Sequence, residues 1–229
     1  GKEENGFMHG PYPAWVDQGA HKSARINFTA NAIPGAIGSG WDALHTLFHE
    51  GGHAAHFSNI RMPAPCFSQE FAPTSVAFAE TQSMFLESVV TDPDWLGRYA
   101  RDANGEPMPV DLIKDMKMDE FRFRAKFMRS MLGVSYSEKA IYEMSEAKLT
   151  PENVTAVVAA IEQRMHSQEA SPRPILSIPH LLSGEASAYY HGYILAEMAV
   201  YQTRTYFFKK YGFITDNPEV GPELREVYW

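Results

Sequence analysis

Four histidines fall within twelve residues, HTLFHEGGHAAH at 45–56, and three members of this stretch have the spacing of a metal site. His49, Glu50 and His53 form the pattern His-Glu-x-x-His. Residues four apart share one face of a helix, so both imidazoles can reach one ion. Glu50 follows the first imidazole and is placed to accept a proton from water at that ion. Two neutral imidazoles and an oxygen ligand suit zinc, although cobalt and manganese accept the same ligands. We therefore expect one zinc ion per chain.

The two outer histidines of the stretch, His45 and His56, fit the pattern less well. Each stands three or four residues from another histidine, but Thr46 and Ala54 occupy the positions where the base would be. We expect structural roles for both, such as orienting a metal ligand or a carboxylate.

Two adjacent glycines, Gly51 and Gly52, lie inside the helix predicted to carry the histidines. Each costs about 1 kcal/mol relative to alanine in a helix interior. The missing side chains therefore predict a close approach, either by the backbone of another helix or by a substrate.

A third zinc ligand is expected from the next apolar segment, VAFAETQSMFLESVV at 76–90. A carboxylate in such surroundings is costly unless it is paired or bound to a cation. Glu80 and Glu87 are seven residues apart and share a helix face, so the spacing leaves both open as ligands. The alternative for either one is an ion pair with Arg61 or Arg98.

An aromatic cluster near the C-terminal end of the chain offers hydrogen-bond donors. Tyr189, Tyr190 and Tyr193 lie close together in GEASAYYHGYILAEM, and His180 stands just upstream. Phenol and imidazole donors near a metal can stabilise the oxyanion of a tetrahedral intermediate. The alternative is that these rings belong to the core.

The elements that must position these residues are mostly helices. The expected fold class is mainly α with one or two short strands, in a single domain spanning residues 1–229. ARINFTA at 24–30 alternates apolar and polar residues as a half-buried strand does. The first predicted helix carries the histidines and is capped by Ser39 or Asp42. Further helices are predicted at 76–90, at 110–147 as two helices split near Gly133, at 150–170, and at 184–211, where Gly212 ends the helix. The predicted loops are 1–22, 61–75 and 171–180.

Composition excludes several classes of partner. The 229 residues carry a net charge of -8 with no basic stripe, which argues against nucleic acid. No apolar run approaches the roughly 20 residues of a membrane helix. The single cysteine and the absence of a signal-peptide pattern favour a reducing, cytoplasmic compartment.

Three segments, in this order, resemble the thimet oligopeptidase and oligoendopeptidase F family of zinc metallopeptidases: LFHEGGHAAHF, AETQSMFLE and IPHLLSGEASAYYHGYILAEM. The resemblance implies a multi-helix, zincin-like catalytic core of the gluzincin type. It gives Glu80 the role of third ligand, and it gives His180, Tyr190 and Tyr193 the role of cleft donors that support the transition state. Aligning on ILAEM selects Tyr190 and Tyr193, whereas aligning on His180 selects Tyr189; we take the first. Proteins of that family are much longer, so we expect a catalytic core cut at both ends, beginning in a Lys-x-x-x-Gly region.

The function expected from these features is hydrolysis of peptide bonds in short peptides. An alternative is a zinc carboxypeptidase or dipeptidase on a related scaffold, for which Arg173 or Arg204 would hold the peptide terminus. A second alternative is a metal-binding piece without turnover.

Overall fold

The computed structural model describes residues 6–60, 74–166, 173–181, 184, 186–227 and 229. Lys2, Arg61 and Cys66 therefore lie outside the described residues. The chain forms two compact units, one of Gly1–Lys117 with Ala196–Trp229 and one of Met118–Leu195. The mainly α class is confirmed, and the single domain stays a prediction.

The first unit begins with two hairpin ribbons, where the sequence predicted a loop over 1–22. Strand β1 (Phe7–Tyr12) pairs antiparallel with β4 (Arg25–Thr29), and β2 (Trp15–Asp17) pairs with β3 (Ala20–Lys22). The loop prediction was wrong because Gly10 and Pro11 fall at a register shift between His9 and Tyr12, where a ladder tolerates them. The turn between β2 and β3 is supplied by Gln18 and Gly19, both with positive φ.

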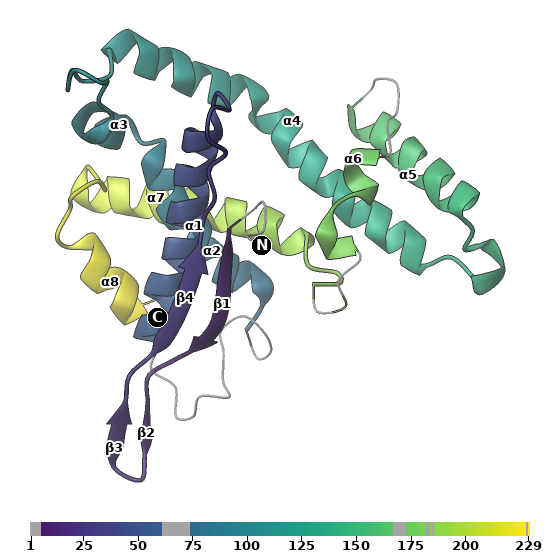
Figure 1. Ribbon diagram of the computed structural model, residues 1–229, viewed down its shortest axis with the longest axis horizontal. Coiled ribbons are helices and arrows are strands. Elements are labelled where there is room, and N and C mark those ends of the chain that lie inside the picture. The colour runs from purple at the N-terminus through teal and green to yellow at the C-terminus, as the bar shows by residue number, and fades with distance from the viewer. Residues whose placement is uncertain (1–5, 61–73, 167–172, 182–183, 185, 228) are drawn as a thin grey trace. The chain divides into compact units, whose positions relative to one another are not determined.

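The strand predicted at 24–30 is confirmed as β4, and it packs against the helix that carries the histidines (Figure 1). Ile26 and Met8 pack on a small core of Phe57, Ile60 and Ala79. The hairpin of β1 and β4 is thereby fixed to one side of that helix.

The two helices predicted to carry the metal ligands are both present. Helix α1 spans Ser39–Asn59 and α2 spans Val76–Val90, and they pack side by side (Figure 1). The predicted cap of α1 was wrong: the N-cap is Gly38, which adopts a left-handed conformation at φ 86°. Ser39 is instead the first helical residue, and its hydroxyl accepts a hydrogen bond from the Ile33 amide.

Further helices complete the first unit and contribute to its main core. Helix α3 (Pro93–Tyr99) is capped by the carboxylate of Asp92, which accepts from the Asp94 amide at 2.9 Å. Helix α7 (His191–Tyr211) begins in the other unit, later than the predicted start at 184. It ends at Tyr211 and is followed by Gly212 with positive φ, as predicted. Helix α8 (Val220–Val227) was not predicted. The core joins α2, α7 and α8 through Phe85, Val200, Phe207, Ile214, Val220 and Leu224.

The second unit is built on the long helix α4 (Val110–Tyr142), which begins in the first unit and is not split. The break predicted near Gly133 was wrong, because the adjacent Val134 packs in a core with Val158 and Ile175 and the helix continues through this point. Helix α5 spans Pro151–His166, and short turns at Glu146–Lys148, Arg173–Leu176 (α6) and Pro179–Leu181 complete the unit. The last two fall where a loop was predicted. The core consists of Val134, Val158 and Ile175.

In the part of the chain that the structure describes, every helix is too short or too polar to cross a lipid bilayer.

Candidate metal centre

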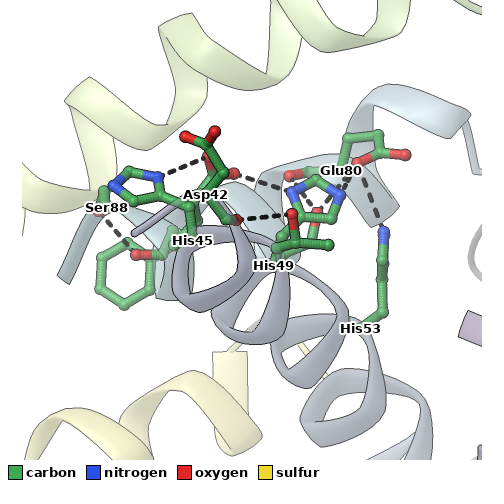
Figure 2. A network of polar contacts seen from close by, with 10 residues as sticks. Asp42, His45, His49, His53, Glu80 and Ser88 are labelled. Atoms are coloured by element: carbon green, nitrogen blue, oxygen red, sulfur yellow. Dashed lines mark hydrogen bonds and ion pairs between the residues drawn. The ribbon is translucent and has the colours of Figure 1, made fainter. Parts of the chain in front are cut away.

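His49 and His53 on α1 face Glu80 on α2, as Figure 2 shows. One ligand atom from each of the three residues lies within 4.8 Å of the other two. The Nε2 atoms of His49 and His53 stand 3.2 Å and 3.4 Å from the same oxygen of Glu80, Oε2. Glu80 is 2% exposed, so its carboxylate is enclosed by the two imidazoles. This geometry brings together the three residues predicted as ligands.

The close approach predicted from the glycine pair occurs at Gly52 and not at Gly51. A Cβ atom on Gly52 would lie 2.7 Å from the Cα of Ser83 on α2, whereas a Cβ on Gly51 would meet nothing within 4 Å. The backbones of α1 and α2 therefore touch next to His53. The contact fixes how far the imidazoles stand from Glu80.

The charges of the group suit a cation. Burial opposes ionisation of Glu80, but hydrogen bonds from His49 and His53 outweigh it and hold the pKa of Glu80 well below its usual range. The Ser83 hydroxyl donates a further hydrogen bond to Glu80 Oε2 at 2.9 Å. Two imidazoles and one ionised carboxylate form the donor set that zinc prefers at a site with an open position. The residues present therefore fit a zinc ion.

His49 carries an additional proton in the metal-free chain. Burial lowers the pKa of His49, but hydrogen bonds to Glu80 and Glu87 outweigh it and raise the pKa to about 10. An imidazole binds a metal only in its neutral form, so metal binding has to displace this proton.

Glu50, the predicted general base, is buried beside the group at 8% exposure. Burial raises the pKa of Glu50, and the positive charges of His49 and His53 act in the opposite direction. Gly6 lies over this side chain, since a Cβ on Gly6 would stand 3.1 Å from Glu50 Cγ and 2.5 Å from the Thr29 carbonyl oxygen. The chain just before β1 thus covers Glu50, a contact that residue spacing gave no means of finding.

Glu87, the other candidate ligand on α2, contacts different atoms. Its Oε2 lies 2.8 Å from His49 Nδ1 and its Oε1 lies 3.3 Å from His45 Nδ1. Burial opposes ionisation of Glu87, but the hydrogen bonds from His45 and His49 outweigh it and lower the pKa to about 2. Glu87 is therefore an ionised carboxylate on the side of His49 away from Glu80.

The ion pairs considered as alternatives do not form among the described residues. Arg98 pairs with Asp216 at 2.8 Å, and Arg61 lies outside the described residues. His56 is fully buried beside the rings of Phe57 and Phe78 and is not in the ligand group.

The aromatic donors gather within the second unit. The ring centroid of His180 lies 5.2 Å from that of Tyr190 and 5.9 Å from that of Tyr193. The Tyr193 hydroxyl is 3.3 Å from His180 Nε2. The ring centroid of Tyr189 also lies 5.4 Å from that of His180, with the planes tilted by 54°, so the structure brings both tyrosine alternatives to the same imidazole. Helix α7 begins at His191, so Tyr190 precedes the helix on which it was predicted.

Comparison with known proteins identifies the family. The model of peptidase family M3 matches residues 1–228. Dipeptidyl carboxypeptidase of Salmonella typhimurium is 26% identical over 195 residues, which cover 82% of this chain and 27% of that protein. A mitochondrial intermediate peptidase of Chaetomium globosum is 32% identical over 153 residues, which cover 64% of this chain and 19% of that protein.

A mitochondrial intermediate peptidase of Coccidioides immitis is 36% identical over a shorter stretch of 77 residues. The chain spans 27% or less of the length of these relatives. The family match nevertheless extends over almost the whole chain and includes all the residues of the metal centre. The chain therefore belongs to peptidase family M3.

Proposed function

We propose that this chain is the catalytic core of a zinc-dependent peptidase that hydrolyses peptide bonds in short peptides. The observation that carries the proposal is the group of His49, His53 and Glu80 with the buried Glu50 next to it in sequence. Membership of peptidase family M3 supports the reaction class.

His49, His53 and Glu80 would hold the zinc ion through Nε2, Nε2 and a carboxylate oxygen. Zinc bound there supplies a Lewis acid that polarises the scissile carbonyl and lowers the pKa of water. Glu50 accepts the proton of the attacking water and returns it to the leaving amine. A raised pKa suits both steps, because a carboxylate with an ordinary pKa holds a proton too weakly at neutral pH.

His180, Tyr190 and Tyr193 are proposed as the donors that stabilise the oxyanion or hold the substrate backbone. Their mutual contacts support this role, because a phenol that accepts the Nε2–H of an imidazole 3.3 Å away is held in place and still carries its own donor hydrogen. Tyr189 is an alternative to Tyr190 at this position.

A second candidate function is release of dipeptides from a free C-terminus, which the name of the Salmonella typhimurium relative favours. Such an enzyme needs a cation to hold the terminal carboxylate. Of the two arginines predicted for that role, Arg204 is engaged by Asp92 and by the Ser88 hydroxyl at 2.9 Å, and the side chain of Arg173 lies outside the described residues. These contacts argue against Arg204 in that role and leave Arg173 as the candidate.

The deciding experiment compares Glu50→Gln with the wild-type chain on a fluorogenic peptide. The matched control is Glu106→Gln, since Glu106 is exposed and is not in the ligand group. We expect Glu50→Gln to retain zinc and to lose about 100-fold or more in kcat. An unchanged rate in Glu50→Gln would show that Glu50 is not the base.

The peptide is supplied in two forms, blocked at both ends or with a free C-terminus. Cleavage of the blocked form supports the oligopeptidase, and cleavage of the free form alone supports the carboxypeptidase. Zinc binding without cleavage of either form assigns the chain a metal-binding role that needs the rest of a longer protein for turnover.

A further inference from the structure

We propose that Glu87 is a positioning residue that holds His49 in the orientation and tautomer required of a zinc ligand, and that His45 holds Glu87. The inference rests on the proposed function, because it concerns how the same metal centre is kept in place. It also gives a role to two residues that the proposed mechanism does not use.

The first step of the argument concerns the two nitrogens of His49. Nε2 faces Glu80 Oε2 at 3.2 Å, and Nδ1 faces Glu87 Oε2 at 2.8 Å. A neutral imidazole has one N–H and one lone pair. For Nε2 to offer its lone pair to a metal, the hydrogen must reside on Nδ1. A carboxylate at hydrogen-bond distance from Nδ1 selects that tautomer and fixes the plane of the ring.

The second step concerns what holds Glu87 itself. Its other oxygen, Oε1, lies 3.3 Å from Nδ1 of His45, which stands one turn before His49 on α1. Figure 2 shows His45 and His49 leaving the same side of α1 toward α2. Each oxygen of the carboxylate therefore has its own imidazole, and rotation of the carboxylate would break both hydrogen bonds.

The third step is the contrast with His53. Nδ1 of His53 is buried and has no hydrogen-bond partner among the residues that the structure describes. Among the described residues, a carboxylate thus orients His49 and none orients His53 through Nδ1. A loss of Glu87 should therefore loosen the orientation of His49 and leave that of His53 as it was.

The test measures zinc affinity by competition with a chelator in the wild-type chain, Glu87→Gln, Glu87→Ala and His45→Ala. Loss of such a carboxylate support typically weakens metal binding by about 10–100-fold. We expect the full loss in Glu87→Ala and a smaller one in Glu87→Gln, because an amide oxygen still accepts the Nδ1 hydrogen. His45→Ala should fall between Glu87→Gln and the wild type. The matched control is Glu106→Gln, with unchanged affinity.

A second readout separates positioning from general damage to the fold. Proton NMR of the zinc-loaded protein detects the Nδ1–H of His49, which a hydrogen bond to Glu87 shifts downfield and protects from exchange with water. We expect this signal to move upfield and to exchange faster in Glu87→Ala, with the signal of His53 unchanged.

Three results would overturn the inference. Equal zinc affinity in Glu87→Ala and the wild type would do so, as would an unchanged Nδ1–H signal of His49 in Glu87→Ala. A stoichiometry of two zinc ions that falls to one in Glu87→Ala would make Glu87 a ligand of a separate ion. These outcomes leave the proposed function intact, whereas an unchanged peptidase rate in Glu50→Gln refutes the proposed mechanism without touching the role of Glu87.

Discussion

The adjacent glycines of α1 offer a matched pair of substitutions with opposite expected signs. Gly51→Ala adds a methyl group that meets nothing within 4 Å, whereas Gly52→Ala places one 2.7 Å from the Cα of Ser83 and 3.0 Å from two carbonyl oxygens of α2. Both substitutions gain the same helix propensity, about 1 kcal/mol. Only Gly52→Ala also forces the backbones of α1 and α2 apart.

The size of the effect follows from the atoms that would collide. Backbone atoms of a packed helix cannot turn aside as a side chain does, so the helices must separate by at least several tenths of an ångström. Overpacking of this kind costs about 1–3 kcal/mol. We expect Gly51→Ala to stabilise the chain by up to about 1 kcal/mol and Gly52→Ala to destabilise it by up to about 2 kcal/mol. The difference between the two variants isolates the clash, because the propensity gain cancels.

Urea unfolding of the metal-free chain, followed by circular dichroism, measures both values. Zinc affinity is a second measurement, and it should fall in Gly52→Ala because Ser83 also donates to Glu80. Equal stabilities of the two variants would refute the packing argument, since propensity alone would then account for both.

Three further predictions concern charge. Zinc binding at pH 8 should release about one proton, because the pKa of His49 is about 10 in the metal-free chain. Calorimetry in buffers of different ionisation enthalpy measures the number of protons released. Binding heats that do not depend on the buffer would contradict this prediction. The stability difference between the wild-type chain and His49→Gln, both metal-free, should be greatest between pH 4.5 and 6.5. The raised pKa of His49 gives stability that is lost as pH rises from 6.5 through about 10, and the lowered pKa of Glu87 gives stability that is lost as pH falls from 4.5 through about 2; a difference that is constant with pH would exclude this coupling. Glu138→Ala should destabilise the chain by about 1–3 kcal/mol, because it removes the buried oxygen that accepts from the Ala188 amide at 2.6 Å. The control is Glu143→Ala, which removes an exposed ion pair with Lys139 worth at most about 1 kcal/mol; an equal loss in both variants would contradict a special role for Glu138.

The helices that carry the candidate metal centre could be predicted because residue composition, spacing and boundary residues all indicate a helix there. The segment at 76–90 lacks breakers and is bounded by polar and proline-containing stretches, and α2 has the same bounds. Helical spacing also placed His49 and His53 on one face. It could not separate Glu80 from Glu87, which share a face of α2. That choice depends on how α1 and α2 are aligned, and the alignment is set by the contact of Gly52 with Ser83.

Elsewhere, tertiary contacts overrode local signals. Gly133 suggested a helix break, at a cost of about 1 kcal/mol, but α4 continues because the neighbouring Val134 packs in the core with Val158 and Ile175. The strands within 7–22 are short and interrupted by glycine and proline, and they depend on a turn at Gln18–Gly19 and, for β1, on packing against α1. Neither effect is visible in a single window of sequence.

The placement of all three ligands on consecutive helices has a consequence for how the chain opens. A zinc ion held by His53 and Glu80 is a cross-link between α1 and α2, and neither helix can unfold without releasing it. A ligand that binds only the folded state at 100 times its Kd adds about 2.7 kcal/mol to the free energy of opening. A zinc ion bound there would therefore make the two helices one cooperative unit of hydrogen exchange, in which amides of α1 and α2 gain protection together.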